Sequence, residues 1–511
     1  MTSRPPADAD RAIPSWEDPV VRAASTAVGG PWGRHGLVGR NYFWTPLRVC
    51  LALTLAVLAL SWLQKSPCKS GAWTENLQYT HLCYSDVIPL YYTEGMDQHQ
   101  VPYADHAVEY PVLTGYFMYT ARTLSGWYDR LADSTGVLPK VNPVESYFDL
   151  TALLLGLAAL VVTWSVFHLS GRRGWDAAMV ALSPVLFVHA FTNWDLLAVA
   201  LSTAGLLAWQ RQIPWFAGVL IGLGTSAKLY PILFCVPLLL LCLRARRMYE
   251  FGQFMFGAVT SWLVINLPIY LLYQDSWKRF YTLNRTRPAD PDSLWNILQY
   301  VRGTPLDPNV GEGQSPTVLN LSIALATVAV VCAVGGLAMV ARTRPRLPQL
   351  LFLLVAGFLL VNKVWSPQYT LWLVPLAVLA RPSWRAILAW QAVEAFLWFP
   401  RMYWYLGASN KGLEEHWFLL AVVARDIAVV WLALLVIRDI LQPEYDPVRR
   451  SGMDDPAGGV LDGADDREEP SWSEEEWAGS WEPEPEPADE ISGGEPPTGG
   501  SSPRGADRNS T

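Results

Sequence analysis

Asp86 is the residue of this chain best placed for chemistry. It follows the first long apolar segment and lies in residues 64–147, a stretch rich in Tyr, Asp and Pro that joins two apolar segments. Loops of this length are usually functional or disordered, and this one is too aromatic to be disordered. A carboxylate near a membrane interface can take a proton from a hydroxyl, so we expect a general base here. A solvated loop aspartate is the alternative.

Two further carboxylates compete for that role. Glu109 stands where the loop returns to an apolar run, and Asp195 begins an apolar run directly after Asn193-Trp194. Each could instead be a first-turn or capping carboxylate, because the helix dipole favours negative charge at an N-terminus. The residues alone leave both interpretations open.

Two lysines stand in apolar surroundings. Lys228 interrupts a long apolar run in GLGTSAKLYP, and Lys363 lies in the short turn VNKVWSPQY. A charge at membrane depth is costly and is functional by default. We therefore expect both lysines to bind an anionic group, rather than to reach the interface by snorkelling.

No metal, cofactor or nucleotide site is predicted. The seven His are scattered, and no pair has metal-ligand spacing on a helix. The GLG at 222–224 lacks the GK[ST] of a phosphate-binding loop. Of the six Cys, Cys68 and Cys83 lie in the long loop. They could form a disulfide if that loop faces an oxidising exterior, and two unpaired thiols are the alternative.

The composition is that of a polytopic membrane protein. The chain has 511 residues, 51% of them hydrophobic, and runs of membrane-spanning length recur along it. Twelve spans are predicted, at about 45–63, 148–169, 175–190, 195–210, 214–227, 229–243, 251–273, 316–341, 348–362, 368–380, 384–400 and 417–438. Residues 441–511 hold 19 Asp and Glu against 5 Lys and Arg, so the rest of the chain is basic. A basic body suits anionic lipids or phosphorylated substrates, although the positive-inside bias alone could produce it.

Charge also predicts the topology. With the N-terminus in the cytoplasm and twelve crossings, the short cytoplasmic connections are all basic, as the positive-inside rule requires. This holds only if 111–128 is an interfacial or re-entrant helix rather than another span. We therefore predict a disordered cytoplasmic arm over 1–44, a transmembrane domain over 45–440 with residues 64–147 as its extracytoplasmic catalytic loop, and an acidic, disordered cytoplasmic tail over 441–511.

Six segments resemble the GT-C class of membrane glycosyltransferases. The resemblance is greatest to glycosyltransferase family 87, the polyprenyl-phosphate-mannose-dependent mannosyltransferases of actinobacteria. The segments are SDVIPLYY (85–92), VEYPVLTG (108–115), NWDLLAVAL (193–201), GLGTSAKLYPILF (222–234), the stretch 285–295 ending in DSLW, and NKVWSPQYTLWLVPL (362–376). AKLYP and SPQY are the most specific of them, and the arm and the acidic tail lie outside the resemblance.

The resemblance implies an all-α polytopic GT-C-like fold with about twelve transmembrane helices and a large first outer loop that carries interfacial helices. It implies hexosyl transfer at the extracytoplasmic face of the plasma membrane. The sugar, most often mannose, would pass with inversion from a polyprenyl-phosphate donor to a lipid-linked or cell-envelope glycan acceptor. Asp86 would be the general base, and Lys228, Arg285 and Lys363 would hold the donor phosphate. The donor and acceptor pocket would be formed by Glu109, Tyr110, Asn193, Asp195, Tyr230, Gln368 and Tyr369. No cofactor is implied. The expected partners are donor, acceptor and membrane lipids, and not nucleic acid.

A polytopic lipid or solute transporter, or flippase, is the alternative function, because it would also have many spans and intramembrane charges. Transporters typically show inverted repeats and paired broken helices. The sequence shows neither, and a large first outer loop is hard to explain in a transporter. A scaffold with a regulatory tail is a third possibility, and it would leave Lys228 and Lys363 unexplained.

Overall fold

The computed structural model describes residue 27, residues 44–311 and residues 313–466. Every regular element among these residues is helical. The compact unit that contains them ends at Asp466. Apart from Ala27 and Trp44, the predicted arm over 1–44 lies outside the described residues.

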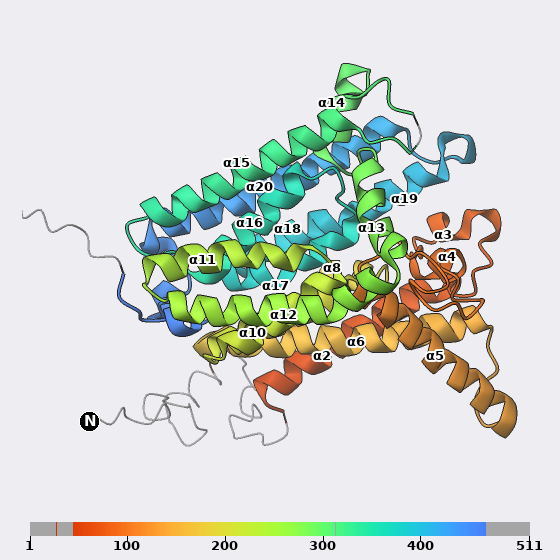
Figure 1. The fold of residues 1–511 in the computed structure, drawn as a ribbon, viewed down its shortest axis with the longest axis horizontal. Coiled ribbons are helices and arrows are strands. Elements are labelled where there is room, and N and C mark those ends of the chain that lie inside the picture. The colour runs from red at the N-terminus through yellow and green to blue at the C-terminus, as the bar shows by residue number, and fades with distance from the viewer. Residues whose placement is uncertain (1–26, 28–43, 312, 467–511) are drawn as a thin grey trace, which may run out of the picture. The chain divides into compact units, whose positions relative to one another are not determined.

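Five helices in the described part of the chain are long and apolar enough to cross a membrane. They are α2 (Pro46–Lys65, continued by η1, Ser66–Cys68), α6 (Pro143–Leu169), α12 (Met248–Leu272), α15 (Thr317–Val340) and α20 (Glu415–Leu441). Shorter apolar helices run beside them (Figure 1): α9 (Asp195–Gln210), α10 (Pro214–Ala227), η4 with α11 (Tyr230–Phe234 and Cys235–Arg244), α16 (Leu347–Val361), and η5 with α17 (Pro367–Tyr369 and Thr370–Ala380). The described residues thus confirm the all-helical prediction and contain five candidate spans, whereas the count of twelve spans stays a prediction.

The remaining elements connect these helices. They are η2 (Thr74–Asn76), α3 (Leu77–Thr80), α4 (Val87–Thr93), α5 (Val112–Thr135), η3 (Gly171–Ala177), α7 (Ala178–Ala181), α8 (Pro184–His189), α13 (Gln274–Thr286), α14 (Leu294–Arg302), α18 (Trp384–Phe396), α19 (Trp398–Leu406) and η6 (Ala408–Asn410). After α20 come η7 (Pro443–Tyr445), η8 (Arg449–Ser451) and η9 (Gly459–Leu461).

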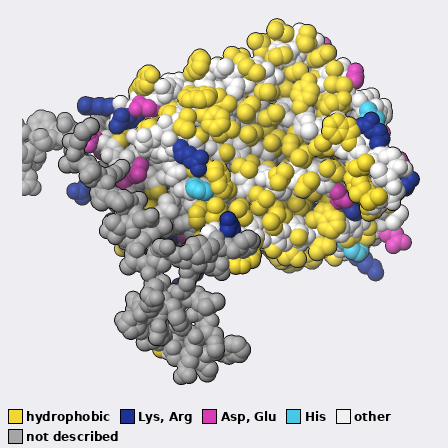
Figure 2. All heavy atoms as spheres, turned by 90° about the horizontal axis from the view of Figure 1, so that it is seen from below, with side chains coloured by type: hydrophobic (Ala, Val, Ile, Leu, Met, Phe, Trp, Pro, Cys, Tyr) yellow, Lys and Arg dark blue, Asp and Glu magenta, His cyan; other side chains and the backbone are white. Residues whose placement is uncertain are grey.

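The surface of the long helices is suited to a lipid environment. Large apolar side chains on the long helices are exposed, among them Leu325 at 63% and Leu434 at 59%. Figure 2 shows one face covered largely by hydrophobic side chains, with Lys, Arg, Asp and Glu gathered toward its two ends. Such a surface is unfavourable in water and favourable against acyl chains.

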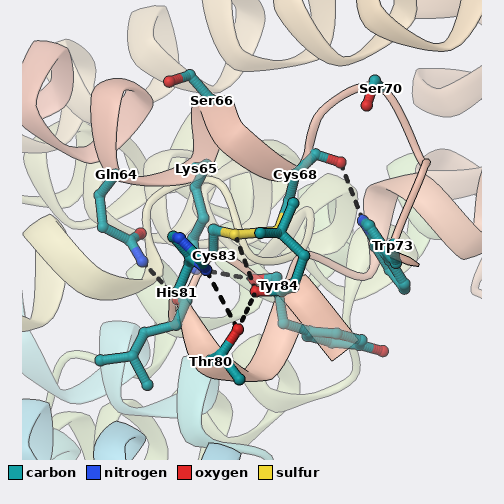
Figure 3. The surroundings of a disulfide bond; sticks show 12 residues. Gln64, Lys65, Ser66, Cys68, Ser70, Trp73, Thr80, His81, Cys83 and Tyr84 are labelled. Atoms are coloured by element: carbon teal, nitrogen blue, oxygen red, sulfur yellow. Dashed lines mark hydrogen bonds between the residues drawn. A yellow bond between two sulfur atoms is a disulfide. The ribbon is translucent and has the colours of Figure 1, made fainter. Parts of the chain in front are cut away.

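The first loop contains several helices, both short and long. The segment predicted to be interfacial at 111–128 forms α5, which extends to Thr135, packs against α6 and is not among the five candidate spans. Ahead of it, Cys68 and Cys83 form a disulfide with their Cα atoms 5.7 Å apart, shown in Figure 3. The disulfide ties the segment that precedes Asp86 to the end of α2 and η1.

Part of the predicted tail is folded. Residues 442–466 contact the helices, and one contact is a buried ion pair in which Arg346 Nε donates to Asp446 Oδ2 at 2.7 Å. Arg244 Nε donates to Asp466 Oδ1 at 2.6 Å, and Trp209 Nε1 donates to the Gly458 carbonyl at 2.7 Å. The acidic composition that predicted disorder over 441–511 is here neutralised by helix-end arginines. Residues 467–511 lie outside the described part.

The apolar helices run between two chemically different ends. We call the end that contacts residues 442–466 the tail end, and the opposite one the cavity end. The short helix α9 runs from Asp195 at the cavity end to Trp209 at the tail end, and α16 runs from Arg346 at the tail end to a turn that holds Lys363. Even helices too short to count as candidate spans therefore reach from one end to the other.

Close packing of α10 on α12 positions the helix that precedes Lys228. A Cβ atom on Gly218 would lie 1.9 Å from the Phe254 carbonyl oxygen, and one on Gly257 would lie 2.0 Å from the Trp215 carbonyl oxygen. Only glycine allows the two backbones to approach this closely, as in other membrane helix pairs. The C-terminal end of α10 is thereby held in place.

Candidate active site

Asp86 is held against the segment that precedes α9. Its backbone N–H donates to the Thr192 carbonyl at 2.8 Å, and the Ser85 hydroxyl donates to the Phe191 carbonyl at 2.7 Å. These bonds join residues more than one hundred positions apart in sequence. They bring the carboxylate of Asp86 next to Asn193.

Neutral amides orient the Asp86 carboxylate. Asn193 Nδ2 donates to Asp86 Oδ2 at 2.7 Å, and Gln368 Nε2 donates to the same oxygen at 3.3 Å. Asn193 Nδ2 also lies 2.9 Å from the Tyr110 hydroxyl. Amide donors fix the direction of a carboxylate without neutralising it, as a general base requires.

Lys228 ends α10 in an extended conformation and is 8% exposed. Its Nζ lies 5.1 Å from the ring centroids of both Tyr110 and Tyr369, a separation at which the aromatic faces stabilise the cation. Nζ also lies 3.5 Å from Asp195 Oδ1. Buried charges are normally paired, and this pair is looser than a direct hydrogen bond.

Asp195 has two properties that the sequence could not separate. It is the first residue of α9, as expected of a first-turn carboxylate, and it is also the partner of Lys228. Trp372 Nε1 donates to Asp195 Oδ1 at 2.8 Å, and the Trp372 ring stacks on Tyr230 with centroids 4.3 Å apart. Asp195 therefore lies behind the lysine, and it is not among the residues that line the cavity described below.

Lys363 holds the backbone at the C-terminal end of α13. Its ammonium group donates to the carbonyls of Arg285 and Arg287 at 3.2 and 2.8 Å and to Asn320 Oδ1 at 2.6 Å. Burial and the neighbouring Arg287 lower the pKa of Lys363 to about 8. All three of its protons are thus engaged by the protein itself. The side chain of Arg285 is exposed and does not line the cavity, whereas Arg287 does.

These residues surround one cavity of about 760 Å³. Among the residues predicted from the sequence, those that line it are Asp86, Glu109, Tyr110, Asn193, Lys228, Tyr230, Lys363, Gln368 and Tyr369. Part of the wall is apolar and consists of Leu229, Ile232, Leu233, Phe280, Leu283 and Phe358. The cavity combines a carboxylate, a buried cation and a wall suited to an acyl or prenyl chain.

The cavity has a second, aromatic part that the sequence did not predict. It is lined by Tyr79, Tyr84, Asp290, Arg401 and Tyr405. Burial and the facing Asp86 carboxylate raise the pKa of the Tyr84 phenol above its usual value. Arg401 lies within the aromatic run WFPRMYWYL, and no spacing in the sequence connects it with Asp86.

Comparison with known proteins agrees with the resemblance noted from the sequence. The model of glycosyltransferase family 87 matches residues 137–362, which confirms that resemblance. The matched part includes Asn193 and Lys228 but not Asp86 or Gln368.

A curated relative is the GPI mannosyltransferase 1 of Kluyveromyces lactis. It is 25% identical over 211 residues, which are 39% of this chain and 51% of the relative. The chain therefore spans about half the length of this relative. With five helices able to cross a membrane, the two comparisons support a membrane glycosyltransferase.

Proposed function

We propose that this chain, as a membrane glycosyltransferase of the kind that family 87 describes, moves a hexose from a polyprenyl-phosphate donor. The acceptor is a hydroxyl of a lipid-linked or cell-envelope glycan. The proposed sugar is mannose, in line with the name of the Kluyveromyces relative. The observation that carries the proposal is that Asp86, oriented by neutral amides, and Lys228, a buried cation, line the same cavity.

The donor would lie with its phosphate near Lys228. The Lys228 ammonium group is only loosely paired with Asp195, so it can donate a hydrogen bond to a phosphate oxygen. Arg287 lines the same cavity. The prenyl chain would follow the apolar wall, where Leu229 and Ile232 are 39% and 54% exposed. Lys363 would support this site by holding Arg285 and Arg287 in position.

The proposed reaction is a single displacement. The acceptor hydroxyl oxygen attacks C1 of the sugar, its proton passes to the Asp86 carboxylate, and the bond from C1 to the phosphate oxygen breaks. The electron pair of that bond goes to the phosphate, so polyprenyl phosphate leaves with one more negative charge. Asp86 then returns the proton to water. A single displacement inverts the configuration at C1, and fixed cations stabilise the charge that develops on the leaving phosphate.

The proposed topology places the cavity end outside the cytoplasm and the tail end inside. The tail end carries Arg244, Arg344, Arg346 and Arg381, and cytoplasmic connections are enriched in such residues. Both termini would then be cytoplasmic and the protein would cross the plasma membrane twelve times.

The test is incubation of the purified protein in lipid nanodiscs with polyprenyl-phosphate-mannose, labelled in the sugar, and a membrane extract as the source of acceptor. The expected result is label in a new lipid or glycan product, and roughly 100-fold slower formation of that product with Asp86→Asn. In proteoliposomes, movement of the intact donor across the bilayer without product would instead indicate a flippase.

A further inference from the structure

The aromatic part of the cavity is formed by tyrosine rings from two separate parts of the chain. Three tyrosine rings on its wall are nearly parallel: the centroids of Tyr79 and Tyr84 lie 6.3 Å apart, those of Tyr79 and Tyr405 lie 5.8 Å apart, and both interplanar angles are 20°. Tyr79 belongs to α3 and Tyr405 to α19. Two distant parts of the chain thus meet to place these rings beside Asp86.

The rings are held from behind. Lys65 Nζ donates to the Tyr84 carbonyl at 2.8 Å, and Trp398 Nε1 donates to the Leu82 carbonyl at 2.8 Å. The disulfide at Cys83 lies directly beside Tyr84 (Figure 3). A surface fixed in this way has little conformational entropy to lose on binding, so weak contacts to a ligand become effective.

Polar groups border the rings. Arg401 Nε donates to Asp292 Oδ2 at 2.7 Å, and its Nη2 donates to the Tyr405 hydroxyl at 3.1 Å. Asp290 lines the cavity and is 7% exposed. Within the described residues, its buried Oδ2 accepts no hydrogen bond. A buried carboxylate oxygen without a donor is costly, and a ligand hydroxyl would satisfy it.

The chemistry of this surface suits a neutral sugar ring. Pyranose C–H groups carry partial positive charge and pack on the negative faces of aromatic rings. Sugar hydroxyls can donate to Asp290 Oδ2, which has no hydrogen-bond donor, while Asp290 Oδ1 lies 4.0 Å from Arg287 Nη2 and balances that charge. The positive charge of Arg401 is already balanced by Asp292. An anionic ligand is therefore not favoured here, and the apolar wall that would take a lipid chain is formed by other residues.

We propose that Tyr79, Tyr405 and Asp290 form an acceptor subsite for a neutral pyranose, and that this subsite presents one sugar hydroxyl to Asp86. The inference rests on the proposed function for the role of acceptor, but sugar binding itself does not depend on it. The acceptor is thereby assigned to the class of glycans whose terminal unit is an uncharged sugar, and not to protein hydroxyls or simple lipid alcohols.

The experiment measures binding without donor and without turnover. Saturation-transfer NMR on the protein in nanodiscs would use methyl α-mannopyranoside and mannotriose as probes, with a serine-containing tetrapeptide as a non-sugar comparison. Both sugars should bind and the peptide should not. Tyr79→Ala and Tyr405→Ala should each weaken sugar binding about tenfold, because each removes a stacking face. Tyr405→Phe, which keeps the ring, should bind nearly as well as the unaltered protein.

Tyr92→Ala is the matched control, because Tyr92 is an exposed tyrosine of the same loop that does not line the cavity. It should bind the sugars normally, and binding of labelled polyprenyl-phosphate-mannose should be unchanged in all of these variants. Sugar binding that survives both alanine substitutions, or a peptide that binds as well as the sugars, would overturn the subsite. A parallel loss of donor binding would assign the rings to the donor instead. Sugar binding without any transfer in the labelled-donor assay would count against the proposed function alone.

Discussion

The hydrogen-bond partners of Asp86 decide what the carboxylate can do. Its side-chain partners are uncharged: the amides of Asn193 and Gln368 donate to it, and so does the phenol of Tyr84. Asp195, in contrast, is paired with Lys228 and bonded by Trp372. Of these two carboxylates on the cavity side, only Asp86 is oriented toward the cavity without an ionic partner. It is therefore the better candidate for a base.

Asp86→Asn should leave folding and donor binding intact and lower turnover roughly 100-fold or more, since the amide cannot accept the proton of the acceptor. The measurement is the initial rate of transfer from labelled donor, with donor binding measured separately. Glu109→Gln is the control, because Glu109 lines the same cavity and is exposed. Near-normal turnover of the Asp86 variant would assign the base elsewhere.

Lys228→Ala should weaken donor binding by on the order of 2–3 kcal/mol, the value of a charge-assisted hydrogen bond in a partly desolvated site. Lys228→Arg should retain part of that affinity. The alanine variant also leaves Asp195 without its cation. The double variant Lys228→Ala with Asp195→Asn therefore separates loss of the phosphate contact from damage to the site. Normal donor binding by both variants would show that Lys228 does not hold the phosphate.

Some of these residues could be found in the sequence and others could not. Asp86, Asn193 and Lys228 are polar residues at the edges of apolar runs, where a charge needs a reason. Arg401 gave no such signal because its partner, Asp292, is 109 positions away. Asp290 belongs to the site because its N–H donates to the Lys363 carbonyl. Only the folded chain creates these contacts.

Among the elements, the segment from Cys68 to Asp86 positions Asp86, the proposed base, and the rings of Tyr79 and Tyr84. It has little regular structure beyond η2 and α3, so its conformation depends on the disulfide and on bonds to neighbouring helices such as that from Lys65. The composition of the loop indicated function. It could not indicate which helix ends the loop would bind.

Cys68→Ser with Cys83→Ser should lower the free energy of unfolding of this segment by roughly 3 kcal/mol, the value for opening a loop of this length. Because Tyr84 and Asp86 follow Cys83 directly, turnover should fall while the contact between α10 and α12 persists. The loss of stability would be measured by thermal unfolding, with limited proteolysis of the loop as the readout. The matched control is Cys235→Ser, which removes a free thiol. An equal effect of the control would mean that the disulfide is not the cause.

At the scale of the whole molecule, we expect the cavity end and the tail end to be accessible from opposite sides of the membrane. Gln98→Cys, in the first loop, should react with a membrane-impermeant thiol reagent in intact cells. Tyr249→Cys, at the tail-end start of α12 and 77% exposed, should react only after permeabilisation. Both would be made in a Cys332→Ser background, because Cys332 is an exposed free thiol. The reverse pattern would invert the proposed topology.

The tail end should depend on the ion pair of Arg346 with Asp446. Asp446→Asn removes the carboxylate to which the buried guanidinium donates, and breaking such a pair typically costs about 3–5 kcal/mol. The thermal midpoint in detergent should fall clearly. Glu444→Gln, at an exposed neighbour, should leave it unchanged. Equal midpoints for the two variants would show that residues 442–466 do not stabilise the helices.

The folded tail segment also has a consequence for the order of biosynthesis. Every residue that lines the cavity precedes α20, so the catalytic end can assemble while the chain is still growing. The guanidinium of Arg346, in contrast, must wait for Asp446, one hundred residues later. A nascent chain halted after Tyr405 and before Asp446 would contain every residue that lines the cavity, but its tail end would still be open. Quality-control proteases could therefore recognise incomplete chains by that end, before any defect reached the cavity end.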